Sequence, residues 1–168
     1  GYDESIPFAQ DYDLWRRLIP GAKFASLPEA LYIWRNRKQN ISNSKRLAQL
    51  ECMFSTSVRL VRETMSSRER LDEDAYRRVW FAFHGRVDMM RDGDIERLEP
   101  FWTLLHERAS LLEKTSEGFA ALGLNLLRHG RLGTGFAMLR IVRERLGRAV
   151  PRKQIAICFL GCMKRRFA

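Results

Sequence analysis

The sequence has 168 residues, 45% hydrophobic and 30% charged, which is enough to build one ordinary domain with an apolar core. Its three cysteines are too few for a disulfide framework, and no apolar run approaches the roughly 18 residues of a membrane span. The net charge of +10 is uneven, because residues 140–168 carry nine basic side chains and only one acidic side chain, Glu144. This basic end predicts either contact with phosphate groups or a solvated helix face.

The sequence pattern of residues 1–43 predicts a short segment that contains one helix and two strands. A helix is expected over Asp11–Ile19, because its apolar residues share one face and Pro20-Gly21 stops it. The pattern that follows is typical of two short strands and then a polar loop, over Lys23–Leu27, Ala30–Trp34 and Asn36–Ser44.

From Lys45 onward the apolar residues recur with a period near 3.6, which predicts helices. Glycines that follow three of these helices are expected to close them in the left-handed conformation. The first predicted helix runs from Lys45 to a break at Ser66-Ser67. Four more follow, over Asp74–Arg91, Ile95–Leu112, Glu117–Arg128 and Gly133–Leu146. The glycines expected to close the first, third and fourth of these four are Gly93, Gly130 and Gly147.

A faint internal similarity relates two of these helix ends. Met90–Asp94 resembles Leu127–Arg131 at an offset of 37 residues, and each is expected to join the end of one helix to the start of another. Hairpin repeats of the tetratricopeptide type would produce this pattern, and so would an antiparallel pair of helical hairpins. Two copies are too few for a solenoid, so we favour the antiparallel hairpins.

Five motifs in residues 1–42 occur in the order and spacing of one known family. They are Gly1-Tyr2-Asp3-Glu4, Gln10-Asp11-Tyr12-Asp13-Leu14-Trp15-Arg16-Arg17, Gly21 with Lys23-Phe24, Leu27-Pro28-Glu29-Ala30-Leu31, and Tyr32-Ile33-Trp34-Arg35 leading to Asn40-Ile41-Ser42. In these motifs the sequence resembles the second half of the catalytic domain of family 2 glycosyltransferases, which has the GT-A fold. The resemblance covers about a quarter of the chain.

The resemblance and the helical pattern together give the expected fold class. The chain should be mainly α, with a short α/β remnant of a GT-A domain over 1–43 followed by an antiparallel helical-hairpin bundle. We expect the helical domain to span 44–149 and a basic amphipathic tail to span 150–168.

The resemblance implies that Asp11 is the general base. A sugar transferase of the inverting kind needs one group to take the proton from the acceptor hydroxyl as that hydroxyl attacks. Arg35, Asp13 and Arg37 are the candidate contacts to the substrate or its diphosphate. The two arginines suit the diphosphate, since a guanidinium presents a planar fork to phosphate oxygens. Asp13 lies at a different helical azimuth from Asp11 and also suits the role of a carboxylate that complements the helix dipole. The sequence departs from the family at Gln10, where an acidic residue is usual, and at Arg37, where histidine is frequent.

The family binds its nucleotide-sugar donor with an N-terminal half in which an Asp-x-Asp motif holds Mg²⁺ or Mn²⁺. No such half is present in this sequence, and Asp11-Tyr12-Asp13 matches the base segment rather than the metal motif. We therefore expect the C-terminal part of a transferase, inactive alone, that binds no metal itself. The partners of the full enzyme would be a nucleotide-sugar donor and a glycan or lipid-linked acceptor. The alternative is a non-catalytic, tetratricopeptide-like interaction module.

The C-terminal tail has an apolar run, Ile155–Met163, between basic residues. This pattern predicts either a helix in the interface of an anionic membrane or a terminal helix packed on the helical domain. A cytoplasmic location is expected, with a peripheral position at the inner membrane face as the membrane alternative. Nucleic acid is not an expected partner, because the aromatic residues follow core stripes instead of alternating with basic residues. The histidines are not at metal-ligand spacing, and Cys158 and Cys162 are expected to be buried thiols.

Overall fold

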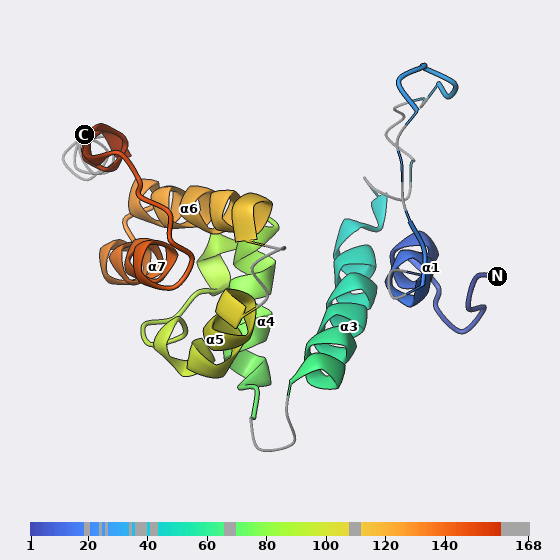
Figure 1. The fold of residues 1–168 in the computed structure, drawn as a ribbon, viewed down its shortest axis with the longest axis horizontal. Helices are drawn as coiled ribbons and strands as arrows, with labels where there is room; N and C mark the ends of the chain where they lie inside the picture. Colours follow the sequence, from blue (N-terminus) through green and yellow to red (C-terminus); the bar gives the residue numbers. More distant parts are fainter. Residues whose placement is uncertain are drawn as a thin grey trace. The chain divides into compact units, whose positions relative to one another are not determined.

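The computed structural model describes residues 1–18, 21–23, 25, 27–33, 35, 40, 44–65, 70–107 and 112–158, with the side chains of 112–115 left out. The chain divides into two compact units, Gly1–Thr64 and Met65–Ala168. All regular elements of the described residues are helices, which confirms the mainly α class (Figure 1). The predicted break at Ser66-Ser67 and most of the predicted loop over 36–44 lie outside the described residues.

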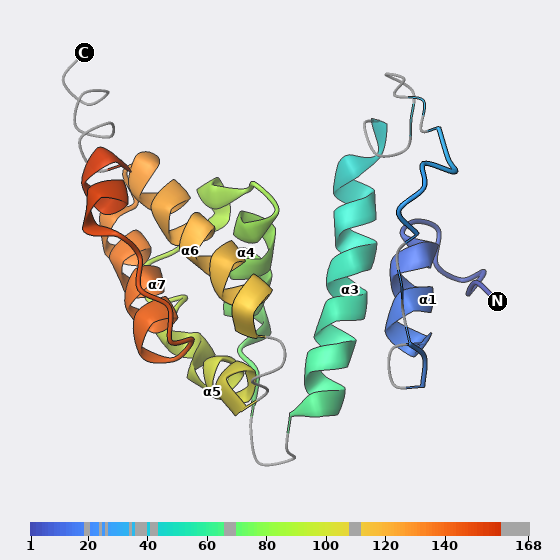
Figure 2. The same cartoon turned by 45° about the horizontal axis from the view of Figure 1, so that its top comes forward.

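The first unit contains α1 (Gln10–Leu18) and α3 (Arg46–Thr64), which lie side by side in every view (Figures 1 and 2). Helix α3 buries a stripe of Leu50, Phe54, Val58 and Val61, at the spacing of one helical face. Helix α1 begins and ends within one residue of the predicted helix. Helix α3, which the predicted domain division assigns to the helical domain, therefore belongs to the same compact unit as α1.

The two strands expected over 23–27 and 30–34 are not formed by the described residues of these ranges. Residues 27–33 form no regular element, and no backbone hydrogen bond joins them to any other described residue. A strand is stable only when a neighbour takes its N–H and C=O groups, and the described part of the chain supplies no such neighbour. The strand prediction is therefore wrong for these residues in this structure.

In the second unit, α4 (Glu73–Phe83) is shorter than the helix predicted over 74–91. Asp72 caps its start by accepting the N–H of Ala75. Gly85, at φ +98°, ends it, because the N–H groups of Gly85 and Arg86 turn back to carbonyls of the last turn at 3.0 and 2.9 Å. The remainder of the predicted helix forms the 3-10 turn η1 (Val87–Met89).

Gly93 also has a positive φ but lies in an irregular stretch between η1 and η2 (Glu96–Leu98), where it closes no helix. Gly130, by contrast, closes α6 (Leu112–Arg128). Residues 127–131 therefore join the two helices of a hairpin, whereas residues 90–94 lie between two 3-10 turns, so the hairpin expected at 90–94 is not formed.

The helix predicted over 95–112 is divided into η2 and α5 (Glu99–Glu107). Pro100 explains the division, because proline lacks the N–H that would continue a helix but is tolerated in a first turn. The indole of Trp102 donates to the carbonyl of Ile95 at 2.7 Å, which fixes α5 against the preceding turn. Trp102 and Phe101 then meet Phe119 of α6 edge-to-face in the core.

Helices α6 and α7 (Leu132–Glu144) form an antiparallel hairpin and lie side by side in Figure 2. Gly123 and Gly135 allow their close approach. A Cβ on Gly135 would lie 2.7 Å from the buried Leu127 side chain and 3.1 Å from the Gly123 carbonyl oxygen. The predicted ends of both helices agree with the structure to within a few residues, apart from five extra residues at the start of α6.

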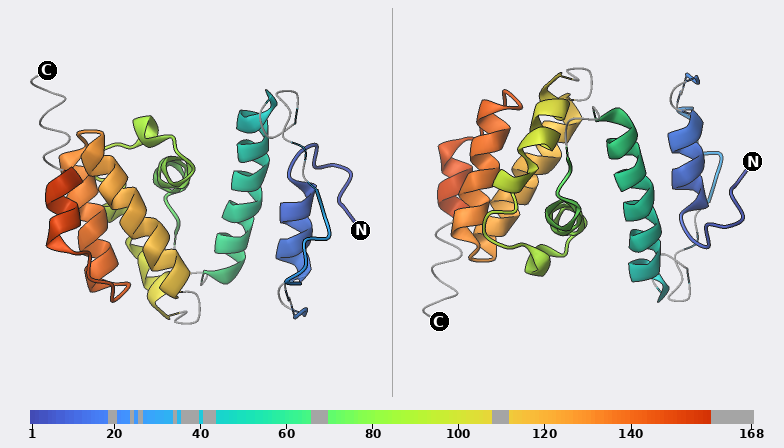
Figure 3. Two further views of the ribbon diagram at one scale, coloured as in Figure 1. Left: turned by 90° about the horizontal axis from the view of Figure 1, so that it is seen from above. Right: turned by 90° about the horizontal axis from the view of Figure 1, so that it is seen from below.

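After α7 the chain runs back along α6 and ends its described part in a short helix over 152–158 (Figure 3). Arg148 pairs with Glu117 near the start of α6, and the Arg128 guanidinium at its end donates to the Cys158 thiol at 3.2 Å. Among the described residues, no helix is long and apolar enough to cross a membrane.

Candidate functional site

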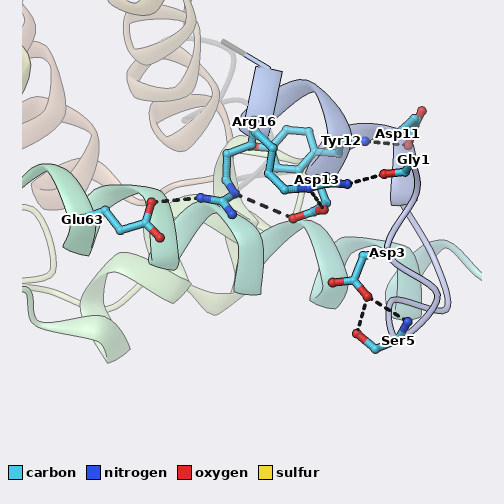
Figure 4. A network of polar contacts seen from close by, with 9 residues as sticks. Gly1, Asp3, Ser5, Asp11, Tyr12, Asp13, Arg16 and Glu63 are labelled. Carbon is cyan, nitrogen blue, oxygen red and sulfur yellow. Dashed lines mark hydrogen bonds and ion pairs between the residues drawn. The ribbon is translucent and has the colours of Figure 1, made fainter. Parts of the chain in front are cut away.

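The two carboxylates of α1 lie in different environments. Asp11 is exposed, whereas the Asp13 side chain is only 1% exposed. Residues two apart on a helix are separated by about 200° around its axis, so the two side chains leave α1 on different sides. Figure 4 shows Asp13 directed towards α3 and Asp11 away from it.

Asp13 is the centre of an ion-pair network that joins three parts of the first unit. Its Oδ2 accepts Arg17 Nε at 2.8 Å, and its Oδ1 lies 3.7 Å from Arg16 Nε. Arg16 continues to Glu63 of α3 at 2.9 Å, and Arg17 donates to the carbonyl of Gly1 at 2.8 Å. In Figure 4, Arg16 lies between Asp13 and Glu63. The network fixes α1 to α3 and to the start of the chain.

Asp11 stands in the first turn of α1 and is accessible to solvent. Its Oδ1 accepts the N–H of Tyr12 at 2.8 Å, and no described residue hydrogen-bonds to its other oxygen. Ala9, which precedes the helix, has φ +56°, a left-handed conformation that costs a residue with a Cβ roughly 1–2 kcal/mol. Such strain is concentrated at functional sites in proteins, and here it lies two residues before Asp11.

Among the described residues, Asp11 makes no hydrogen bond or ion pair with Arg35 or Asp13. The Arg35 side chain is exposed. Its carbonyl oxygen accepts the side-chain amide of Asn40 at 2.7 Å. Arg37 lies outside the described residues. Asp13 is too buried to touch a substrate unless the chain around it moves, so its predicted contact to substrate stays a prediction.

The second unit contains a charged hollow of about 620 Å³ that the sequence did not suggest. Its lining comes from α4, from residues 88–92 and from the turn before α7, and it includes Arg77, Arg78, Arg91, Arg131, Asp74, Asp88 and Asp92. Only folding brings these residues together, because no local motif joins them.

The charges around this hollow largely cancel. Arg78 pairs with the buried Asp94 at 2.7 Å, and this hydrogen bond raises the pKa of the Arg78 guanidinium. Arg86 pairs with Asp88 at 2.9 Å and lowers the pKa of that carboxyl. The side chain of Arg131 donates to the Asp88 carbonyl at 3.2 Å. With four arginines against three aspartates in its lining, the hollow has too small an excess of positive charge to attract anions strongly.

Four of the nine basic residues of 140–168 are also paired in the fold, and three others, Lys164, Arg165 and Arg166, lie outside the described residues. The acidic partners of four arginines come from α5, α6, α7 and the turn before α5, as the pairs Arg140–Glu96, Arg143–Glu144, Arg145–Glu99 and Arg148–Glu117. These pairs favour the solvated-face interpretation over a free phosphate-binding surface.

The described part of the tail packs on protein. Cys158 is buried against Leu127 and Leu139, with Ile155 beside it, while Ile157 is exposed. This arrangement favours the packed terminal helix over the membrane-interface helix. The buried thiol predicted at Cys158 is confirmed, whereas Cys162 and Met163 lie outside the described residues. Within the described ranges, no group of three or more histidine, cysteine or carboxylate residues is arranged to hold a metal.

Comparisons with protein-family models, with curated proteins and with solved structures found no match to this chain. The glycosyltransferase resemblance therefore depends on the motifs of residues 1–42 alone.

Proposed function

We propose that this chain is the acceptor-side, C-terminal portion of a family 2 glycosyltransferase, in which Asp11 takes the proton from the acceptor hydroxyl. The observation that carries the proposal is the contrast between the two carboxylates of α1. Asp11 is exposed and has a free oxygen among the described contacts, as a general base requires. Asp13 is buried and ion-paired.

The residues around Asp11 would serve to position it. The network of Asp13, Arg16 and Glu63 holds α1 against α3, and Arg17 ties the helix to Gly1. The N–H of Tyr12 holds one Asp11 oxygen and leaves the other to meet a hydroxyl. A base held in this way loses little orientational freedom when the acceptor binds.

The donor and its divalent cation would bind to the other half of the enzyme. The described residues of this chain do not form a Mg²⁺ or Mn²⁺ site, so no step involving the ion is assigned to them. Arg35 and Arg37 remain the proposed diphosphate contacts. The donor-binding half would have to supply the rest of that site.

The test uses the longer polypeptide, read in frame through a donor-binding half upstream of Gly1. We expect Asp11→Asn to reduce sugar transfer by about 10²–10⁴-fold, the usual contribution of a general base. Glu107→Gln, at an exposed carboxylate on α5, is the matched control and should leave transfer unchanged. Transfer by Asp11→Asn at the rate of the control would overturn the assignment.

The 168-residue chain alone should neither transfer sugar nor hydrolyse a nucleotide sugar in the presence of Mn²⁺. Turnover well above a blank would contradict the proposal that the donor site lies outside this chain.

The proposed enzyme is cytoplasmic and acts on a glycan or lipid-linked acceptor, in keeping with a role in bacterial cell-surface polysaccharide. A peripheral contact with an anionic membrane through 150–168 would have to use side chains other than Ile155 and Cys158, which pack inward. Sedimentation with anionic liposomes tests it. Equal sedimentation of the intact chain and of a chain without residues 150–168 would remove the membrane contact.

The second candidate is a non-catalytic helical interaction module. It is favoured by a small groove of about 380 Å³ between α4 and α6, lined by Phe83, Gly118, Ala121 and Leu122 among others. Phe83 is exposed at this groove although it is large and apolar. A start codon directly before Gly1 would favour this candidate over the transferase.

A further inference from the structure

Trp15 lies on the same face of α1 as Asp11. Residues four apart in a helix differ by about 40° around its axis, so positions 11 and 15 lie one turn apart on one side. The exposures agree with this, because Asp11 is exposed and Trp15 is 52% exposed, whereas Asp13 is buried. Asp11 is directed away from α3 in Figure 4, and the helical spacing places Trp15 on that side of α1 as well.

An indole is usually among the more buried side chains of a domain. Trp80 and Trp102 of the second unit follow this rule, at 9% and 0% exposed. Trp15 departs from it, since about half of its side chain is open to solvent although α1 packs on α3. Leu18, 41% exposed, extends this apolar surface by one more turn of α1. An exposed apolar surface of this kind marks a place where a ligand or partner binds.

The charges of α1 indicate which ligand suits this surface. Arg16 and Arg17 lie on the other side of the helix, where both pair with Asp13. The face of α1 that carries Trp15 therefore has one carboxylate and no basic side chain, so it does not suit a phosphate group. A pyranose ring suits it, because its hydroxyl groups can donate to a carboxylate and its face of C–H groups can cover an indole. Ligand sites combine an aromatic surface with a few polar groups in this way.

The proposed base determines where the acceptor must lie. The hydroxyl that loses its proton has to come within about 2.6–3.2 Å of the Asp11 carboxylate. Cβ atoms of residues four apart on a helix are separated by about 5–6 Å. Helical side chains also lean towards the N-terminus, which brings the indole of Trp15 towards the turn of Asp11. A sugar ring whose hydroxyl meets Asp11 therefore lies within reach of Trp15.

We propose that Trp15 stacks on the pyranose ring of the acceptor and holds it so that one ring hydroxyl meets Asp11. This inference rests on the proposed transferase function, and it makes a sugar ring, not a lipid phosphate, the group that Asp11 deprotonates. Trp15 binds and orients the acceptor and takes no part in the proton transfer.

Binding of simple sugars to the 168-residue chain tests the site. The probes are the methyl β-glycosides of glucose, galactose and N-acetylglucosamine, and sorbitol, a polyol without a ring, is the control ligand. We expect at least one glycoside, and not sorbitol, to shift the indole N–H resonance of Trp15 in NMR spectra. A chain in which none of the three glycosides shifts this resonance would overturn the proposal.

Substitution of Trp15 tests whether its ring makes the contact. Trp15→Leu should raise the dissociation constant of the bound glycoside about tenfold, as expected for the loss of one aromatic stack, and Trp15→Phe should change it little. Phe136→Leu, at another half-exposed aromatic side chain, is the matched control and should have no effect. Circular dichroism should show that the variants keep the helical content of the parent. Equal binding by Trp15→Leu and the parent would overturn the stacking.

Kinetics of the longer polypeptide separate this inference from the proposed function. Trp15→Leu should raise the KM for the acceptor about tenfold and leave kcat and the donor KM nearly unchanged, because it removes binding and not chemistry. If Asp11→Asn abolishes transfer but Trp15→Leu leaves the acceptor KM unchanged, the stacking is wrong and the base stands. If Asp11→Asn leaves transfer unchanged, the proposed base is wrong. If Trp15→Leu lowers the stability of the longer polypeptide without changing the acceptor KM, the donor half covers Trp15 and the stacking is again wrong.

Discussion

Arg78 holds the carboxylate of Asp94 with two of its nitrogens, Nε and Nη2, at distances of 2.7 to 3.0 Å. Asp94 is 1% exposed and also accepts the backbone N–H of Arg91 at 2.7 Å. The pair ties α4 to the irregular segment that follows η1. The sequence pattern predicted that α4 would continue through residues 84–91, but in the structure α4 ends at Phe83 and the Arg78–Asp94 pair fixes the segment beyond it.

We predict that Asp94→Ala lowers the free energy of unfolding of the second unit by about 3–5 kcal/mol, because it leaves the Arg78 guanidinium without its partner. Urea denaturation followed by circular dichroism measures the change. Asp88→Ala breaks an exposed pair with Arg86 and should change the stability little. Similar stability for the two variants would contradict the role of the buried pair.

Substitutions at two glycines of α7 should have opposite effects. Gly135→Ala places a methyl group against Leu127 and the Gly123 carbonyl, so we expect a loss of about 1–3 kcal/mol. Gly133→Ala meets no heavy atom closer than 4.0 Å and should stabilise α7 by up to about 1 kcal/mol. Thermal unfolding measures the melting temperatures of both variants, and Gly135→Ala should melt at a lower temperature than Gly133→Ala. Equal melting temperatures would show that α6 and α7 do not approach as closely as described.

Substitutions of the two α1 carboxylates should separate stability from catalysis. Asp13→Asn removes the charge that holds Arg16 and Arg17, and it should lower the free energy of unfolding by about 1–3 kcal/mol. Asp11→Asn should leave stability nearly unchanged and abolish most transfer by the longer polypeptide. Denaturation curves and transfer assays on the same two variants make the comparison. A stable Asp13→Asn with reduced transfer would instead support a substrate contact for Asp13.

The Arg86–Asp88 pair predicts a small acid dependence. The hydrogen bond from Arg86 lowers the pKa of Asp88 below its ordinary value of 3.8. The pair therefore contributes its stability above pH 3.8 and loses that contribution as the pH falls through the lowered pKa. Arg86→Gln should return the Asp88 pKa towards 3.8, as followed by NMR titration of the carboxyl carbon. An unchanged titration would show that the pair is absent in solution.

Helices whose limits are set by local sequence signals, such as apolar periodicity and a closing glycine, were predicted correctly. The period of apolar residues located α1, α6 and α7, and Gly130 marked the end of α6. The same signals failed for α4, because Gly85 was not recognised as its end and tertiary pairing of Asp94 fixed the segment beyond it. The predicted strands failed for a different reason, since strand formation depends on a partner that residues 27–33 do not have among the described residues.

The candidate site was predictable only in part. The motifs pointed to Asp11 and Asp13, and their helical spacing predicted that they face different directions. The burial of Asp13 and its link through Arg16 to Glu63 depend on the packing of α1 against α3, 47 residues apart in sequence at that contact. The charged hollow of the second unit joins residues from three segments, and no motif in any one of them indicates it.

The coding sequence read in frame upstream of Gly1 tests the proposed transferase most directly. We expect an open frame of about one mononucleotide-binding half-domain, with alternating strands and helices and an Asp-x-Asp motif near its end. A start codon immediately before Gly1 would contradict it, and Asp11 would then have no donor half with which to act.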